Sequence, residues 1–352
     1  MAEADSSKTI LAADIGGTSS RFALFHAGRS LADSPAGLQL VRKLKFPTNS
    51  CMDSAHLMRI LAESTGNDGG YFAPASPKPV QIDAAVFAIP GPASVADISI
   101  TPPEGEICNC PNVKWPLEAS PIIEALQGAP IRFINDFAAN GLACAMLPHV
   151  LDAVTVLAGE EQNHFPSAVI GAGTGLGHCL VLPGKMPVVV GSEAGHTLFP
   201  FTSDEENLRR FLADIHGTDR LETEMAMAGD ALANIYAYCT GQKVHPHEVS
   251  PLAAKNPEVM DLISRFYGRA VQHYILNTLP LGGIYITGGL AANLPEVLTH
   301  PAFARELREM NPMGKSLGAI PVRHVRNTSL GLWGAAAYAC LLLGGLGIFH
   351  FR

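Results

Sequence analysis

The sequence predicts a two-domain α/β protein, and three observations support that prediction. The chain has 352 residues, more than a single hydrophobic core usually supports. Apolar runs that suit buried strands alternate with helical segments along the first half. A pattern of strand, glycine turn and strand occurs once in each half. We expect a smaller α/β domain formed by residues 1–146 and 331–352, and a larger one formed by residues 147–330.

The composition excludes several classes of partner. Hydrophobic residues make up 47% of the chain and charged residues 16%, which is typical of a folded globular protein. The formal net charge is -8, and no cluster of Lys and Arg interrupts it. We therefore expect no nucleic acid and no membrane surface as a partner. An acidic protein can still bind ATP, because Mg²⁺ and backbone N–H groups supply a positive field.

Cysteine usage indicates a reducing compartment, and we expect a cytoplasmic protein. The 7 Cys have no regular spacing. Cys108 and Cys110 form one close pair without a second pair, so no zinc site is expected.

Neither end of the chain predicts a membrane segment. Met1–Lys8 is polar and lacks the apolar core of a signal peptide. Thr328–Phe349 contains no Asp, Glu, Lys or Arg over a length that can span a bilayer. Glycines interrupt this run, however, and the predicted helix covers only Leu332–Leu343.

The first glycine turn lies between strands predicted at residues 9–13 and 21–25. It is typical of an ordinary hairpin turn. It also suits a phosphate clasp, because Gly16 and Gly17 let backbone N–H groups approach oxyanions and Thr18 adds a hydroxyl. In that interpretation Asp14 faces Mg²⁺.

The remaining elements of the first half follow from local pattern. Strands are expected at residues 40–46 and 82–89, a helix at 54–64, loops at 66–79 and 93–111, and a helix from Pro116 to Gln127.

A buried strand then ends at Asn135 and Asp136, and a helical segment follows. Asp is a common helix N-cap. A carboxylate at the end of a sheet strand is also well placed to take a proton from a bound hydroxyl. The residues alone leave both interpretations open.

The second glycine turn contains Gly173, Thr174 and Gly175 between strands within residues 168–182. Thr174 takes the position that Thr18 has in the first turn, which indicates an internal duplication that grips one polyphosphate. Neither turn contains a Lys, so Mg²⁺ and backbone dipoles are expected to meet the phosphate charge.

Two polar residues of the second half, Glu193 and His196, are candidates for reading sugar hydroxyls. Glu193 and His196 flank a small-residue turn, and Glu224 lies in a helix expected to open at a capping box over residues 219–222 and to run to Cys239. Taken alone, Glu193 suits a solvated position, His196 suits a loop histidine that bonds a carbonyl, and Glu224 suits a surface position that favours the helix dipole.

Later elements end in a third glycine turn. Helices are expected at residues 257–277 and 301–310 and strands at 282–287 and 322–325, with a loop at 313–321. Gly288 and Gly289 follow the first of these strands and would let a flat nucleoside lie on the backbone.

Taken together, these motifs resemble the bacterial glucokinase family, in the zinc-free branch of the actin-like ATPase/hexokinase superfamily. The matching motifs are Asp14-Ile-Gly-Gly-Thr-Ser-Ser-Arg21, Ile134-Asn-Asp-Phe137, Gly171-Ala-Gly-Thr-Gly-Leu-Gly177, Glu193-Ala-Gly-His196, Glu224-Met-Ala-Met-Ala-Gly229, Gly282-Gly-Ile-Tyr-Ile-Thr-Gly-Gly289 and Gly331-Leu-Trp-Gly-Ala335. The resemblance implies a two-domain actin-like ATPase (ribonuclease H-like) hexokinase-type fold with a cleft between domains.

The resemblance also implies an activity, which is ATP-dependent phosphorylation of glucose to glucose 6-phosphate by an ATP:hexose 6-phosphotransferase. Asp136 would be the general base at the interdomain cleft. The substrate-binding residues would be Asn135, Glu193, His196, Glu224 and Asn112, the last within Asn112-x-x-Trp115. The residues for Mg²⁺ and ATP would be Asp14, Gly16, Gly17, Thr18, Gly173, Thr174, Gly175, Gly288 and Gly289. A homodimer is the family expectation.

Three alternatives stay open at this point. The first is a kinase for another hexose or an N-acetylated amino sugar. The second is a sugar-responsive repressor, and the third is an actin-like ATPase without a sugar site. The segment 93–111 is longer than is usual in the family, and residues 90–94 lack the acidic residue often found there. One wall of the expected sugar site therefore departs from the family pattern.

Overall fold

The computed structural model describes residues 7–28, 37–63, 80–91, 107–110, 113–184, 187–309 and 312–344. The chain divides into two compact units. Unit 1 comprises Met1–Val150 and Ser329–Arg352, and unit 2 comprises Leu151–Thr328.

The described part of unit 1 is built on a five-stranded sheet in the order β3-β2-β1-β4-β7. Its strands are β1 (Lys8–Ile15), β2 (Ser19–Ala27), β3 (Gln39–Pro47), β4 (Ala84–Ile89) and β7 (Ile131–Asn135). The first three strands pair antiparallel, whereas β1, β4 and β7 run parallel. A short antiparallel pair, β5 (Ile107–Cys108) and β6 (Leu117–Glu118), lies outside this sheet.

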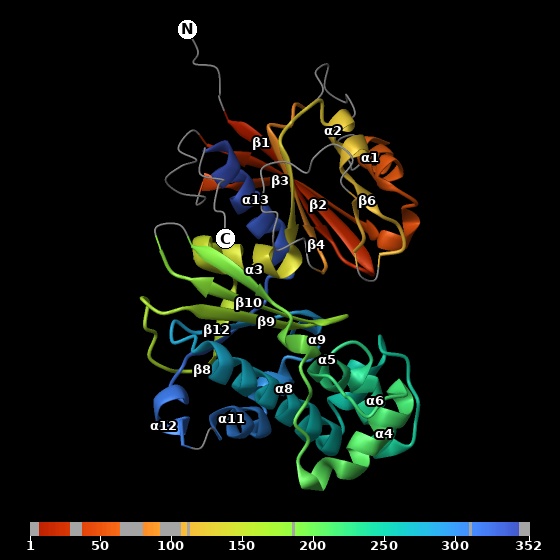
Figure 1. The fold of residues 1–352 in the computed structure, drawn as a ribbon, viewed down its shortest axis with the longest axis vertical. Helices are drawn as coiled ribbons and strands as arrows, with labels where there is room; N and C mark the ends of the chain where they lie inside the picture. The colour runs from red at the N-terminus through yellow and green to blue at the C-terminus, as the bar shows by residue number, and fades with distance from the viewer. Residues whose placement is uncertain are drawn as a thin grey trace. The chain divides into compact units, whose positions relative to one another are not determined.

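Helices cover both faces of this sheet (Figure 1). They are α1 (Ser54–Glu63), α2 (Ala119–Ala125), α3 (Asp136–Met146) and α13 (Leu330–Leu343). Side chains alternate along a strand, so Leu11 and Ala13 enter the core that includes Leu57 and Ile122 of α1 and α2. Asp14 points to the opposite face, where α13 packs on β1, β4 and α3.

The described part of unit 2 repeats this plan. Its sheet has the order β11-β10-β9-β12-β13-β8, formed by β8 (Ala153–Leu157), β9 (Ser167–Ala172), β10 (Leu176–Leu182), β11 (Val188–Ser192), β12 (Ile284–Thr287) and β13 (Val322–Val325). An antiparallel hairpin again leads into parallel strands, since β9 pairs antiparallel with β10 and parallel with β12. The predicted internal duplication is therefore confirmed at the level of topology.

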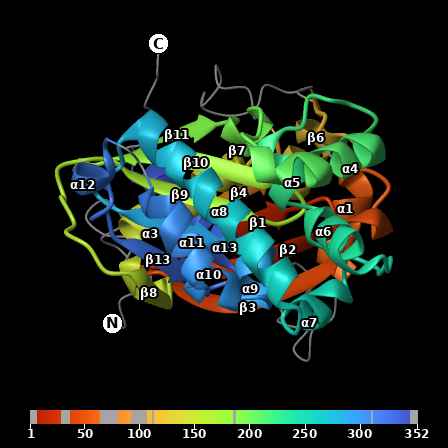
Figure 2. The ribbon, with the colours of Figure 1, turned by 90° about the horizontal axis from the view of Figure 1, so that it is seen from below.

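The helices of unit 2 gather around one long central helix (Figure 2). They are α4 (Glu206–His216), α5 (Thr223–Met227), α6 (Ala231–Thr240), α7 (Val249–Ala253), α8 (Pro257–Thr278), α9 (Gly289–Asn293), α10 (Glu296–Thr299), α11 (Pro301–Arg308) and α12 (Gly314–Leu317). Asn256 caps the start of α8 by accepting hydrogen bonds from two backbone N–H groups, and Pro257 occupies the first turn. Helix α8 packs against α6, α10 and α11.

Several sequence predictions about helices were wrong in detail. The helix expected from residue 219 to Cys239 is two helices, because Gly229 adopts φ 57 between α5 and α6. The expected capping box at 219–222 is absent, because α5 begins at Thr223 and its N-cap residue is Glu222, not Asp219. The capping box of this unit lies instead at Thr202 and Glu205. Residues 314–317, expected as loop, form α12.

The described helices include none that is long and apolar enough to cross a membrane. Helix α13, predicted at Leu332–Leu343, begins two residues earlier at Leu330 and ends before Gly344. All seven cysteines are free thiols. Burial, with smaller contributions from Cys108 and Asp136, raises the pKa of Cys110 to about 12. This thiol is therefore protonated at neutral pH.

Candidate functional site

The predicted phosphate turn and the predicted base lie at one edge of the sheet of unit 1. Asp14 of β1 is in register with Ala88 of β4, and Ala88 is in register with Ile134 of β7. Adjacent strands are about 4.8 Å apart, so the ends of β1 and β7 are separated by about 10 Å. Because the three strands run parallel, Asp14 and Asp136 lie at the same end of the sheet, the end at which these strands finish.

Asp14 sits in a partly buried, charged environment. Its carboxylate accepts a hydrogen bond from Arg21 Nη1 at 3.2 Å, and its side chain is 17% exposed. Burial raises the pKa of Asp14, while Arg21 and Lys43 oppose that shift. A Cβ at Gly331 would lie 3.1 Å from Asp14 Cγ, so the first turn of α13 lies against this carboxylate.

Arg21 and Lys43 are positive charges beside this turn. The motif from Asp14 to Arg21 contains Arg21, but the sequence predicts no role for either residue because neither lies in the glycine turn itself. They lie on β2 and β3, and Lys43 donates a hydrogen bond to Ser329 just before α13. Burial lowers the pKa of Lys43, and the neighbouring Arg21 and Lys45 lower it further. The expectation that only Mg²⁺ and backbone dipoles supply positive charge near the turn was therefore incomplete.

Asn135, not Asp136, is the N-cap of α3. Its Oδ1 accepts hydrogen bonds from the N–H groups of Phe137 at 2.9 Å and Ala138 at 3.0 Å, and its Nδ2 donates to Gly91 O at 2.9 Å. One N–H of the amide is left over for a ligand. Asp136 is the first helical residue, is half-buried, and accepts from Phe137 N at 2.9 Å. The capping interpretation of Asp136 was therefore wrong.

The expected sugar-side segment is only partly described. Asn112 lies outside the described residues. Trp115 is 4% exposed and belongs to the hydrophobic core of unit 1, where its indole Nε1–H donates to Thr48 O at 3.1 Å. Trp115 therefore has a structural role in the hydrophobic core of unit 1.

In unit 2 the second glycine turn is joined to Glu224. The Glu224 carboxylate accepts a hydrogen bond from Leu176 N at 2.8 Å, and a Cβ at Gly175 would lie 2.8 Å from Glu224 Oε2. Gly229, just beyond α5, donates its N–H to Gly173 O at 2.8 Å. The interpretation of Glu224 as a solvated surface residue was therefore wrong.

The third glycine turn lies beside the second. β12 and β9 are parallel, with Thr287 in register with Gly171. Gly288 has φ 95, and a Cβ there would lie 2.4 Å from Ala172 O, so only glycine fits. A Cβ on Gly289 would lie 3.9 Å from Gly173 Cα. Backbone from both turns thus forms one side-chain-poor surface, at the carboxyl ends of two parallel strands.

A third polar group of unit 2 surrounds His196, which ends the short helix η4 (Ala194–His196). His196 Nδ1 lies 2.7 Å from Glu222 Oε2, and His196 Nε2 lies 3.8 Å from Glu193 Oε2. The hydrogen bond to Glu222 raises the pKa of His196. The sequence predicts Glu222 as part of a capping box and carries no local signal for its pairing with His196, which is 26 residues away.

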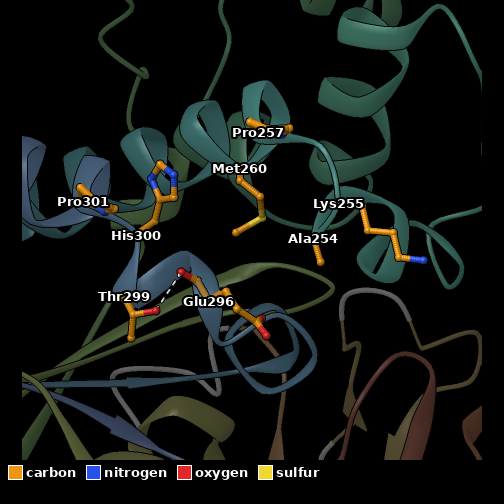
Figure 3. Close-up of a pocket in the computed structure, with 8 residues that line it drawn as sticks. All are labelled: Ala254, Lys255, Pro257, Met260, Glu296, Thr299, His300 and Pro301. Carbon is orange, nitrogen blue, oxygen red and sulfur yellow. Dashed lines mark hydrogen bonds between the residues drawn. The ribbon is translucent and has the colours of Figure 1, made fainter.

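A pocket of about 390 Å³ in unit 2 is separate from all of these groups (Figure 3). It is lined by Ala254, Lys255, Pro257, Met260, Glu296, Thr299, His300 and Pro301. No predicted site residue lines it. The described residues also contain no cluster of three or more His, Cys, Asp or Glu that could hold a metal ion.

Comparison with known proteins agrees with this arrangement. A family model described as Glucokinase matches residues 11–341. A glucokinase of a Nostoc species is 29% identical over 297 residues, covering 75% of this chain and 84% of that protein. A glucokinase of Stenotrophomonas maltophilia is 29% identical over 357 residues, covering 95% and 96%. The solved structure of a glucokinase from an Antarctic psychrotroph has a TM-score of 0.72 at 23% identity, covering 94% and 98%.

The range matched by the family model contains all three glycine turns and the ends of β1 and β7. The solved structure confirms the predicted actin-like ATPase fold. The chain therefore belongs to the glucokinase family and is a sugar kinase.

Proposed function

We propose that this protein phosphorylates glucose at the 6-hydroxyl with ATP as donor. The observation that supports this best is the register across β1, β4 and β7, in which a glycine turn ends β1 and a carboxylate follows β7, two parallel strands about 10 Å apart with β4 between them. That span suits a phosphate chain at one strand end and an acceptor hydroxyl at the other. The two curated relatives described above are both named glucokinase.

Asp136 is the proposed general base. It accepts the proton of the sugar 6-hydroxyl while that oxygen bonds to the γ-phosphorus and the bond from phosphorus to the ADP oxygen breaks. The start of α3 favours negative charge, which keeps the carboxylate in the form that a base requires. Because Asn135 already satisfies the first N–H groups of the helix, Asp136 need not act as the cap.

The remaining hydroxyls of the sugar are proposed ligands of Asn135, Glu193, His196 and Glu224. Asn135 offers its second amide N–H, and the carboxylates of Glu193 and Glu224 accept hydrogen bonds from hydroxyls. Glu224 also accepts from Leu176 N, which fixes its position beside the second glycine turn. We assign Asn112 to the same set on the family resemblance alone.

The nucleotide is proposed to bind the three glycine turns, with Gly16, Gly17, Thr18, Gly173, Thr174 and Gly175 toward the phosphates and Gly288 and Gly289 toward the nucleoside. Mg²⁺ binds proteins through one or two carboxylates plus substrate phosphates, so the single partly buried carboxylate of Asp14 beside a phosphate turn fits it. When bound, Mg²⁺ would neutralise charge on the phosphates. Arg21 and Lys43 keep the surroundings of Asp14 positive.

A coupled assay of ADP release tests this function. Purified protein is supplied with ATP, Mg²⁺ and either glucose, fructose, mannose, N-acetylglucosamine or N-acetylmannosamine. The expected result is that glucose has the highest kcat/KM. Turnover restricted to an N-acetylated sugar would replace glucose as the substrate, and absence of turnover with every hexose would refute the proposal.

A further inference from the structure

Thr48 contacts the first glycine turn, although Thr48 and Gly16 are 32 residues apart in the sequence. It opens the short helix η2 (Thr48–Ser50) after β3 and is completely buried. Its Oγ1 donates to Gly16 O at 2.5 Å, and its backbone N–H donates to Thr18 O at 3.1 Å. A single residue therefore holds two carbonyl groups of the turn.

The hydroxyl of Thr48 is itself fixed in direction. Its one hydrogen is used on Gly16 O, so the contact of 2.9 Å with Ser20 Oγ has Ser20 as the donor. Ser20 is also completely buried. On its other side the Thr48 carbonyl accepts hydrogen bonds from Trp115 Nε1 and Cys51 N, both at 3.1 Å. Thr48 is thus anchored to the core of unit 1.

These contacts determine where the N–H groups of the turn point. In a trans peptide the C=O of one residue and the N–H of the next point in opposite directions. The carbonyls of Gly16 and Thr18 point toward Thr48, so the N–H groups of Gly17 and Ser19 point away from it. Two N–H groups on one side of a glycine turn form a site for an oxyanion.

We propose that Thr48 is a positioning residue of the phosphate turn, holding the Gly16 and Thr18 carbonyls so that the Gly17 and Ser19 N–H groups face the phosphates of the nucleotide. This inference rests on the proposed function, in which the turn binds phosphate. It predicts that the Thr48 hydroxyl affects phosphate binding without contacting the nucleotide.

The test compares Thr48→Val, Thr48→Ser and Ser50→Ala by calorimetry with ADP and AMP in the presence of Mg²⁺, and by kinetics where the parent protein turns over. Valine keeps the shape of threonine and removes the hydroxyl, whereas serine keeps the hydroxyl. Ser50 is the matched control, because it belongs to the same short helix as Thr48 and its exposed hydroxyl donates a hydrogen bond to Pro47 O at 2.7 Å. Thermal melts confirm that each variant is folded at the assay temperature.

In Thr48→Val the Kd for ADP and the KM for ATP are expected to rise by about tenfold, as for the loss of one well-formed hydrogen bond. The KM for glucose and the Kd for AMP should stay within about twofold, since neither ligand depends on a second phosphate site. Thr48→Ser should restore parental values, and Ser50→Ala should match the parent. Thr48→Val with lowered melting temperature but unchanged ADP affinity would reduce Thr48 to a structural residue and overturn the inference.

A second variant covers the case in which Thr48→Val does not fold. Ser20→Ala removes the donor that directs the Thr48 hydroxyl, so the Kd for ADP should rise by about threefold. Unchanged ADP affinity in Ser20→Ala would then overturn the inference. If the parent protein binds ADP but phosphorylates no hexose, the proposed reaction is refuted. The effect of Thr48 on ADP binding is then still measured by calorimetry. A parent that binds no ADP would overturn the inference together with the nucleotide site.

Discussion

Asp136 occupies the first position of α3, immediately after the residue that caps the helix. Asp136→Asn should therefore leave folding nearly unchanged, because the cap at Asn135 is intact. The amide cannot accept the hydroxyl proton, and a positioned general base contributes about 10²–10⁴-fold, so kcat should fall by at least that order. Steady-state kinetics and a thermal melt measure both effects. A variant that keeps more than about a tenth of parental kcat would remove Asp136 from the role of base.

His196 and Glu222 provide a second test at the scale of single residues. Glu222→Gln removes the carboxylate that does most to raise the pKa of His196, so this pKa should move down toward its ordinary value. Glu193→Gln is the matched control, because Glu193 lies 3.8 Å from His196 Nε2 and Glu222 lies 2.7 Å from Nδ1. NMR titration of the imidazole should show the larger shift in Glu222→Gln. Equal shifts, or none, would contradict the pairing.

The same pair has a pH dependence with a definite sign. A histidine whose pKa is raised by folding contributes stability that is fully present below the unfolded value of 6.5 and is lost as pH rises through the folded pKa. His196 is 55% exposed, so this contribution is small.

Residue types could be predicted from the sequence more readily than residue pairings. Asp14, Asp136 and Glu224 were singled out from motifs, and the structure places each beside a turn or strand end. Thr48 was missed because its partners are 32 residues away and no local pattern records a contact at that distance. Asn135 and Asp136 are equally good caps on paper. The extended backbone at Asn135, with φ -62 and ψ 141, decides between them.

At the scale of elements, α3 and α8 begin with the same kind of cap. Asn135→Ala and Asn256→Ala should each lower the free energy of unfolding by about 0.5–2 kcal/mol, because each removes an acceptor for two N–H groups. Only Asn135→Ala should also raise the KM for glucose, since α3 carries Asp136. Chemical denaturation and hexose kinetics on both variants separate the two effects. A rise in KM in Asn256→Ala would show that lost stability alone perturbs the site.

A second prediction at the scale of elements concerns the turn between β12 and α9. Gly288 and Gly241 both have positive φ, of 95 and 72, but only Gly288 faces backbone at its Cβ position. Gly241→Ala should cost about 1–3 kcal/mol for the backbone conformation alone. Gly288→Ala should cost more and should also weaken ADP binding, because the Ala172 carbonyl must move. Equal loss of stability with unchanged ADP affinity would exclude this turn from the nucleotide site.

Strands were the elements most fully predicted, because each is a short apolar run bounded by glycine or polar residues. The division between α5 and α6 could not be predicted from helical composition, since residues 223–240 suit a helix at nearly every position. The positive φ of Gly229 interrupts that run, and the hydrogen bond from Gly229 N to Gly173 O ties it to the second glycine turn. Tertiary contact therefore outweighs local propensity here.

Beyond single elements, unit 2 contains a buried ion pair between Arg269 and Glu205. Arg269 is 4% exposed, Glu205 is 2% exposed, and Arg269 Nη1 lies 2.6 Å from Glu205 Oε2. Arg269 also bonds Pro200 O at 3.0 Å and Glu306 Oε2 at 3.0 Å. Arg269→Met leaves Glu205 buried with less compensation and should lower the free energy of unfolding by about 3–5 kcal/mol.

The exposed pair of Arg326 and Asp152, at 2.7 Å, is the matched control for this substitution. Arg326→Met should lower the free energy of unfolding by less than about 1 kcal/mol. Both variants are compared by denaturant titration. Similar losses in the two variants would mean that burial does not distinguish these ion pairs.

The position of α13 has a consequence for the order in which the protein can be made. The sheet of unit 1 is synthesised first, but α13, which packs beside α3 on one of its faces, comes after all of unit 2. Ile10 and Ala12 of β1 are fully buried in the finished protein, and α13, which packs on β1, reaches that strand only after unit 2 has been made. Partly covered sheets are prone to aggregate, so the nascent chain carries this hazard through the translation of its entire second unit. A stop codon at Ser329 would spare every proposed site residue and still remove the helix that packs on β1.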